Sequence, residues 1–181
     1  MLTTPRLRLF GCADDSIVDG PGIRFAIFVQ GCTHCCKGCH NPEAQPVDGG
    51  REVGLDELMA RIEQNPLISG ITLSGGEPFD QPEPLCELAL WTKQLVRVDK
   101  NDKPLAPLTV WAYSGYTFEQ LSAGLPSPAA RRLLELCDVL VDGLFVQEQF
   151  DYTLKWRGSA NQRIIDVAAS LAAGSIVDFQ V

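Results

Sequence analysis

The stretch "IRFAIFVQG" at residues 23–31 is rich in β-branched and aromatic side chains and predicts a buried strand that ends where a run of cysteines begins. Two later stretches, "GITLSGGEP" (70–78) and "LTVWAYSG" (108–115), are also short apolar runs that meet glycine. A fourth strand is predicted at "DVLVDG" (138–143). Each of these strands is followed by an unusual loop, so we expect one rim of the sheet to carry the functional site.

The segments between these strands show helical periodicity. Residues 55–64 place four apolar side chains on one helical face, residues 85–95 carry a second apolar stripe, and residues 128–137 read as a third helix. Alternating strands and helices imply right-handed crossovers and a parallel sheet. Two arrangements fit, an open doubly wound sheet or a partial α/β barrel. In both, ligands bind at the carboxyl ends of the strands.

The outer segments are shorter. "RLRLF" (6–10) alternates polar and apolar residues and predicts a strand at the sheet edge, while "QRIIDV" (162–167) and "SIVDFQV" (175–181) look extended with a short turn between them. The polar, proline-containing stretch 99–107 predicts a surface loop. A length of 181 residues without repeats or linkers predicts a single domain over residues 1–181.

The composition narrows the function classes. A formal net charge of −8 argues against a nucleic-acid-binding module, which would show a basic face. No apolar run approaches the roughly 20 residues that span a bilayer. The amino terminus, "MLTTPRLRLFG", has no apolar signal core, so we expect no export and a cytoplasmic location. The seven cysteines then read as thiols or metal ligands rather than disulfides.

The segment "GCTHCCKGCHN" (31–41) holds four of the seven cysteines and both histidines of the chain. Cys32, Cys36 and Cys39 give the spacing Cys-x3-Cys-x2-Cys. A zinc site that uses all four thiolates is the rival interpretation, but Cys35 adjoins Cys36 and no second cysteine pair follows. Three thiolates suit an iron–sulfur cube in which one iron lacks a protein ligand. An open coordination position is typical of a catalytic metal site.

Several motifs together resemble one enzyme family. The cysteine spacing resembles the cluster motif of the radical S-adenosylmethionine enzymes, and "SGGEPF" (74–79) matches their glycine–glycine–acid motif. "DGPGIRFAIFVQGC" (19–32) resembles the lead-in of the activating enzymes for glycyl-radical proteins. "DVLVDGLFVQEQFDYTLKWRGSANQRIID" (138–166) resembles the carboxyl-terminal third of the branch that activates anaerobic ribonucleoside-triphosphate reductase. The similarity covers roughly residues 15–170 and implies a partial (incomplete) α/β barrel of the radical S-adenosylmethionine type.

The resemblance also implies an activity. A 4Fe–4S cluster would be held in a loop at residues 31–43 by Cys32, Cys36 and Cys39, with Cys35 a bystander. An electron from a low-potential donor such as flavodoxin or ferredoxin would cleave S-adenosylmethionine to a 5′-deoxyadenosyl radical, which generates a glycyl radical on the reductase. Two alternatives stay open: an activase of another glycyl-radical enzyme, and a non-enzymatic iron–sulfur or zinc protein. An electron carrier would cap every iron and lack the glycine–glycine–acid loop.

The resemblance further implies the cofactor contacts. Gly75 and Gly76 would let the backbone come close to the ligand. Glu77 would face the methionyl ammonium group, and a plain helix-start acid is the alternative interpretation. The other implied contacts flank the last cysteine or line the same rim: Gly38, Cys39, His40, Ser114 and Asp142.

Two groups have no assigned role in the sequence. His34 lies inside the cysteine loop, and its simpler interpretation is a solvated residue. "WRGSANQR" contains Arg157, Asn161 and Arg163, which would either bind the cofactor carboxylate, dock the partner protein or form a structural hydrogen-bond network.

Overall fold

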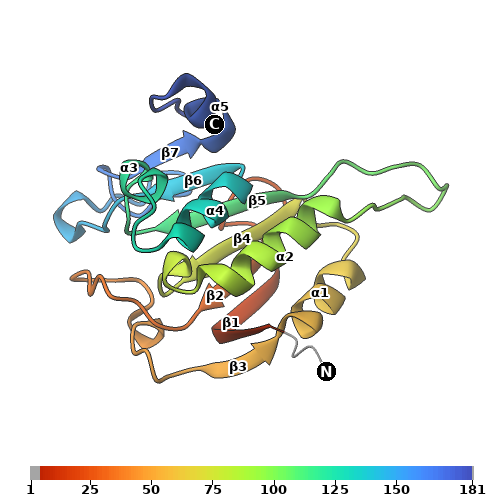
Figure 1. Ribbon diagram of the computed structural model, residues 1–181, viewed down its shortest axis with the longest axis horizontal. Coiled ribbons are helices and arrows are strands. Elements are labelled where there is room, and N and C mark those ends of the chain that lie inside the picture. The colour runs from red at the N-terminus through yellow and green to blue at the C-terminus, as the bar shows by residue number, and fades with distance from the viewer. Residues whose placement is uncertain (1–4, 181) are drawn as a thin grey trace.

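The computed structural model describes residues 5–180, which form one sheet with helices packed against it (Figure 1). The strands are β1 (Arg6–Ser16), β2 (Arg24–Val29), β3 (Arg51–Gly54), β4 (Gly70–Gly75), β5 (Thr109–Ser114), β6 (Val139–Asp142) and β7 (Arg163–Asp166). The α-helices are α1 (Leu55–Gln64), α2 (Pro82–Gln94), α3 (Phe118–Ser122), α4 (Pro128–Leu136) and α5 (Val167–Ala173). Short 3-10 helices are η1 (Pro42–Ala44), η2 (Pro78–Asp80) and η3 (Gln147–Gln149).

The sheet is mixed and open. Its order is β3-β1-β2-β4-β5-β6-β7. The central strands β2, β4, β5 and β6 run parallel, whereas β1 is antiparallel to β2 and β7 is antiparallel to β6. The predicted α/β class is confirmed. The sheet is not closed, since β3 and β7 are its two edges, and a partial barrel of the radical S-adenosylmethionine type stays a prediction.

The central elements lie where the sequence predicts them, and the outer ones differ. The strand predicted at residues 6–10 is confirmed, but its predicted place at the sheet edge is wrong, because β1 continues to Ser16 and pairs with β2 on one side and β3 on the other. The turn expected after residues 162–167 instead contains the helix α5. Of the strand predicted at 175–181, the described part makes only an isolated bridge between Asp178 and Ile165, and residue 181 lies outside the described residues.

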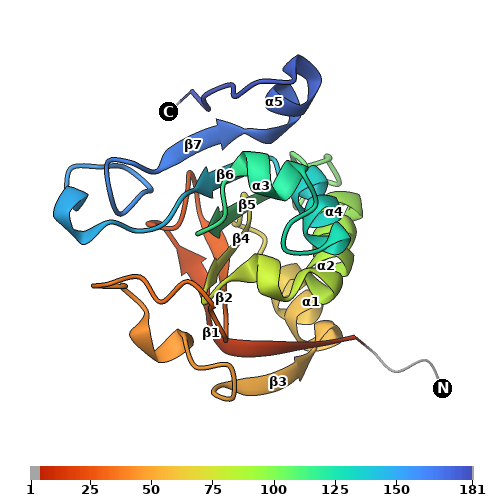
Figure 2. The ribbon, with the colours of Figure 1, turned by 60° about the vertical axis from the view of Figure 1, so that its left-hand side comes forward.

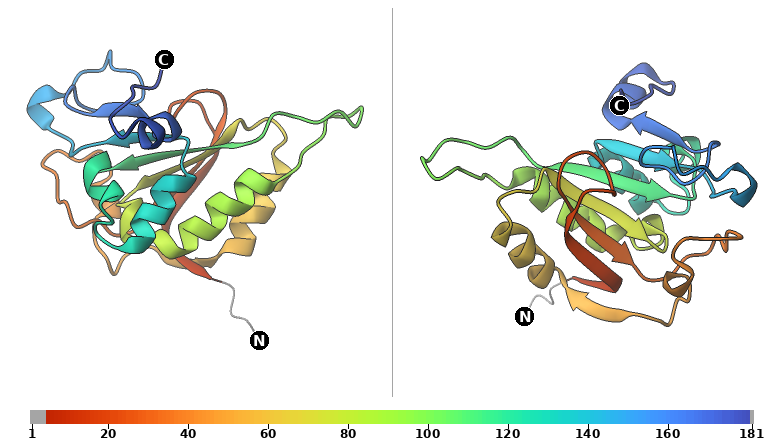
Figure 3. Two further views of the ribbon diagram at one scale, coloured as in Figure 1. Left: turned by 45° about the horizontal axis from the view of Figure 1, so that its top comes forward. Right: turned by 180° about the vertical axis from the view of Figure 1, so that it is seen from behind.

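The helices α1, α2 and α4 cover one face of the sheet (Figure 2). Alternate side chains of each strand point to opposite faces, so Phe25, Ile27 and Val29 of β2 enter the main core on the helix side. Seen from behind, the strands lie in front of these helices (Figure 3). That second face carries a smaller cluster around Trp111 and Val141. Within residues 5–180, no helix has the length and apolar character needed to cross a membrane.

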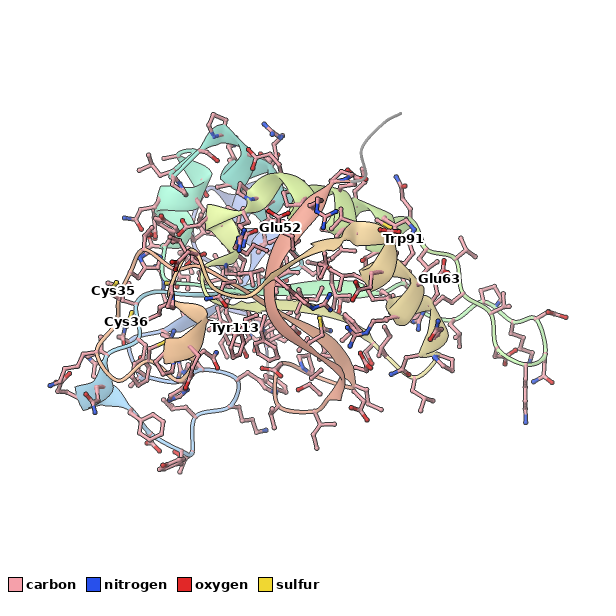
Figure 4. The ribbon with its side chains drawn as sticks, turned by 90° about the horizontal axis from the view of Figure 1, so that it is seen from below. Cys35, Cys36, Glu52, Glu63, Trp91 and Tyr113 are labelled. Carbon is pink, nitrogen blue, oxygen red and sulfur yellow. The ribbon has the colours of Figure 1, made fainter. Side chains whose placement is uncertain are left out.

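The cysteine loop and the predicted surface loop lie at opposite ends of the molecule. Figure 4 shows Cys35 and Cys36 at one end of the molecule and Trp91 and Glu63, near the ends of α2 and α1, at the other. The predicted surface loop at 99–107 projects beyond that second end (Figure 1). The cysteine loop therefore lies at the carboxyl ends of the parallel strands, the edge where ligands bind in α/β sheets.

Candidate functional site

A cavity of about 550 Å³ opens at the carboxyl ends of β2, β4 and β5. Most of its wall comes from the cysteine loop, residues 74–77, residues 113–115 and the segment 143–162, and Val18, Asp19 and Phe28 also contribute. The volume lies in the range of small-molecule sites, about 300–1,000 Å³. The fold thus brings all four loops predicted to form one rim to a single cavity, the fourth through Gly143.

Three of the four clustered cysteines line this cavity, namely Cys32, Cys36 and Cys39. Cys35 is exposed and is not part of the lining. Its backbone adopts a left-handed conformation, with φ at 51°. Three thiols on one cavity wall are a donor set that suits an iron–sulfur cube, in which each thiolate caps a different iron. Across residues 5–180, no three His, Cys, Asp or Glu side chains converge tightly enough to hold a single metal ion.

The thiols are partly screened from water. Burial raises the pKa of Cys32 to about 11, against a smaller lowering effect of the backbone N–H of His34. The Sγ atom of Cys39 accepts a hydrogen bond from the backbone N–H of Asn41 at 3.4 Å. A thiol must lose its proton to bind a metal, so assembly of a cluster at these cysteines would release protons.

Glu77 lines the cavity, and its side chain is only 1% exposed. Its Oε1 atom accepts hydrogen bonds from the backbone N–H of Phe79 at 3.0 Å and from Ser114 Oγ at 2.9 Å. Its Oε2 atom accepts one from the backbone N–H of Gly115 at 2.8 Å and lies 3.0 Å from His34 Nε2. Glu77 is also the N-cap of η2, so it does act as a helix-start acid.

The interpretation of His34 as a solvated residue is wrong. Its side chain is 14% exposed and pairs with Glu77, and its ring packs edge-on against Tyr116 with centroids 4.5 Å apart. The hydrogen bond to Glu77 raises the pKa of the imidazole above its usual value. Loop composition could not reveal this, because Glu77 is distant in sequence.

Gly75 and Gly76 both line the cavity, and the structure shows why each position requires glycine. Gly75 has φ at 98°, in the left-handed region that favours glycine. At Gly76, a Cβ atom would stand 2.1 Å from the carbonyl oxygen of Gly31. The close approach predicted at these glycines therefore includes the backbone of the cysteine loop itself.

His40 lines the cavity beside the third cysteine. Its ring packs against Phe145, with centroids 4.9 Å apart, and Phe150, at 5.5 Å. Gly38 does not line the cavity; its φ is 73°, and a Cβ atom there would stand 2.8 Å from the side chain of Gln147. Gly38 thus shapes the loop and its contact with η3.

Asp142 lies apart from the other predicted contacts. It lines a neighbouring cavity of about 730 Å³ rather than the one that the cysteines line. Its carboxylate is buried and accepts hydrogen bonds from the backbone N–H of Phe118 at 2.7 Å and from Arg163 Nε at 2.9 Å. Arg163 also forms a two-pronged ion pair with Glu119, at 3.0 and 2.9 Å. These groups hold the ends of β6 and β7 together.

The polar cluster in "WRGSANQR" is largely a structural network. Arg163 pairs as described, Asn161 Nδ2 donates to the carbonyl of Leu144 at 2.8 Å, and Arg157 donates to the carbonyl of Gln162 at 2.7 Å. Arg157 alone of the three also lines the cysteine cavity.

Several aromatic residues of the cavity were not predicted from the sequence. Tyr113, Phe145 and Trp156 line it, and Trp156 packs on Trp111 with ring centroids 5.6 Å apart. The aromatic residues of "LFVQEQFDYTLKWRG" are the signal in the sequence, because they follow the last parallel strand without a helical or strand period. Asp19, the first residue of the stretch "DGPGIRFAIFVQGC" (19–32), also lines the cavity.

Comparison with known proteins gives matches over most of the chain. A family model described as a 4Fe-4S single cluster domain matches residues 18–165. Proteins named anaerobic ribonucleoside-triphosphate reductase-activating protein from Vibrio cholerae and Haemophilus influenzae are 38% and 39% identical over 152 and 155 residues, which cover 82% of this chain and 90% of each relative. A protein of the same name from Enterobacteria phage T4 is 30% identical over 162 residues, covering 87% of this chain and 90% of its own.

Proposed function

The chain belongs to the family of anaerobic ribonucleoside-triphosphate reductase-activating proteins, and from this premise we propose that it is a radical S-adenosylmethionine enzyme that generates a glycyl radical on that reductase. The proposed cluster ligands are Cys32, Cys36 and Cys39, in the loop at residues 31–43. A low-potential donor such as flavodoxin or ferredoxin is the proposed reductant, and a cytoplasmic location stays a prediction.

One observation carries the proposal: a single cavity is lined by the three cysteines and by Glu77. Held by Cys32, Cys36 and Cys39, a reduced 4Fe–4S cluster would supply the electron that breaks a carbon–sulfur bond of S-adenosylmethionine, giving methionine and a 5′-deoxyadenosyl radical. This radical would take a hydrogen atom from a glycine of the reductase and would be released as 5′-deoxyadenosine. Glu77 is the proposed partner of the methionyl amino group, because this acidic residue lines the same cavity as the three cysteines.

The chain's own residues position the substrate and exclude water. Ser114 and the backbone N–H of Gly115 orient the carboxylate of Glu77 before any ligand arrives. Phe145, Trp156 and Tyr113 place apolar surface around the cavity, which limits access of water to a reactive species. His40, packed on Phe145, is the proposed contact for the adenine end.

The test uses the anaerobically reconstituted protein with dithionite and S-adenosylmethionine. We expect 5′-deoxyadenosine, and, when the anaerobic ribonucleotide reductase is added, a carbon-centred glycyl radical in the electron-spin resonance spectrum. Absence of 5′-deoxyadenosine from a protein with a full complement of iron would refute the proposed reaction. A radical on a different glycyl-radical enzyme, but not on this reductase, would change the assigned partner.

A further inference from the structure

The cluster loop, residues 31–43, reaches the buried carboxylate of Glu77 through one side chain. His34 Nε2 lies 3.0 Å from Glu77 Oε2, although His34 sits between two of the proposed cluster ligands in the sequence. The other hydrogen-bond donors to this carboxylate lie outside the cysteine loop, next to the ends of the central strands. They are Phe79 in η2, Ser114 at the end of β5, and Gly115 directly after it. Those three fix the carboxylate to the sheet, and His34 links it to the loop.

The imidazole is held in place by its surroundings. It lies against Gly115 so closely that a Cβ atom there would stand 2.3 Å from His34 Cδ2. The ring of Tyr116 packs edge-on against it with centroids 4.5 Å apart, and the Tyr116 hydroxyl donates to Asp80 at 3.0 Å. The contact with Glu77 is therefore part of the folded structure and not one orientation of a free surface side chain.

We infer that His34 is a positioning residue, which sets the place of the cluster loop relative to the carboxylate of Glu77. The inference rests on the proposed function, in which one small molecule meets both the cluster on the cysteines and Glu77. Such a molecule is bound well only if its two anchoring points are held at the right separation beforehand, since ordering them on binding reduces affinity. His34 provides this link without being a ligand itself.

The experiment measures the dissociation constant of S-adenosylmethionine by anaerobic equilibrium dialysis, with the iron and sulfide content of each reconstituted protein. His34→Ala and His34→Asn lose the donor at the Nε2 position, and we expect affinity to fall about tenfold or more, the effect of one hydrogen bond to a charged group. His34→Gln places an amide nitrogen near that position, so it should restore most of the affinity. Iron content should equal that of the wild-type protein in all three.

The neighbouring Thr33 offers a matched control. Its Oγ1 atom donates to Asp80 at 3.1 Å, so Thr33→Ala removes a contact between the same loop and η2 without touching Glu77. We expect Thr33→Ala to bind S-adenosylmethionine as the wild type does.

Three results would overturn the inference about His34 and leave the proposed function intact. They are an unchanged affinity in His34→Ala, an equal loss of affinity in Thr33→Ala, or a loss of iron in His34→Ala. A fully loaded wild-type protein that does not bind S-adenosylmethionine would instead overturn the proposed function, and the inference with it.

Discussion

The carbonyl oxygen of Gly31 occupies the place that a side chain on Gly76 would need, since a Cβ atom there would stand 2.1 Å from it. The same oxygen accepts the backbone N–H of Glu77 at 2.8 Å, and the N–H of Gly76 donates to the carbonyl of Val29 at 2.8 Å. The start of the cysteine loop and the glycine turn after β4 are thus in direct backbone contact.

This contact predicts that Gly76→Ala displaces the cysteine loop. We expect less iron per chain after reconstitution and a loss of roughly 1–3 kcal/mol in the free energy of unfolding, the usual range for overpacking. Iron analysis and urea unfolding measure the two effects. Gly11→Ala is the control, because nothing lies within 4 Å of a Cβ atom there. A Gly76→Ala protein with normal iron and stability that binds S-adenosylmethionine poorly would show that the glycine serves the ligand instead.

The lining of the cavity predicts unequal roles for the clustered cysteines. Replacement of Cys32, Cys36 or Cys39 by alanine should abolish the visible absorbance of the cluster or leave an inactive one, because each removes a proposed ligand. Cys35→Ala should retain both cluster and activity, because this exposed side chain does not line the cavity. A cluster that survives Cys36→Ala but is destroyed by Cys35→Ala would reverse the ligand assignment.

The ion pair between Arg163 and Glu119 predicts a dependence of stability on acid. Its hydrogen bonds lower the pKa of Glu119 from 4.5 to about 2. Because the folded pKa is the lower one, the pair stabilises the fold fully above pH 4.5, and this contribution is lost as the pH falls towards 2. Glu119 is 59% exposed, so the effect should stay below about 1 kcal/mol.

Urea unfolding of the wild type and Glu119→Gln across that pH range measures this contribution. The wild type should be the more stable protein near neutral pH, and the difference should shrink in acid. A difference that stays constant down to the lowest pH would contradict the assignment.

The aromatic residues Tyr113, Phe145 and Trp156 form an aromatic wall of the cavity, and we predict that Phe145 contributes to cofactor binding. Its ring supports His40 at 4.9 Å and lines the cavity. Phe145→Ala should weaken S-adenosylmethionine binding severalfold without loss of iron, because no thiolate moves. Tyr152→Ala, at a side chain that is 92% exposed, is the control and should bind normally. Equal affinity in both variants would remove the aromatic wall from the site.

The central fold could be predicted because its elements carry strong periodic signals. Continuous apolar runs define β2, β4, β5 and β6, and the apolar stripe of α1 gives its bounds, Leu55–Gln64, directly. The edges carry weaker signals. The strand β3 buries only Val53, and the far half of β1, "GCADDS", pairs through its backbone while its side chains stay polar or small. The helix α5 is largely alanine and lacks an apolar stripe.

The candidate site also has a part that could be predicted from the sequence and a part that could not. Local spacing was enough to single out the cysteines and the "SGGEP" turn, because those residues are close together in sequence. The pairing of His34 with Glu77, and the separation of Asp142 from the cysteine cavity, depend on how loops from different strands meet. No local pattern in the chain encodes such meetings.

The cavity draws its walls from residues as far apart as Val18 and Gln162. During synthesis, a ribosome therefore releases the cysteine loop well before the segment that forms the opposite wall. A cluster inserted into the nascent chain would lack the aromatic wall of Phe145 and Trp156 and would meet water and oxidants directly. Insertion of the proposed cluster would therefore be best timed after translation is complete, when residues 143–162 are in place on the opposite side of the cavity.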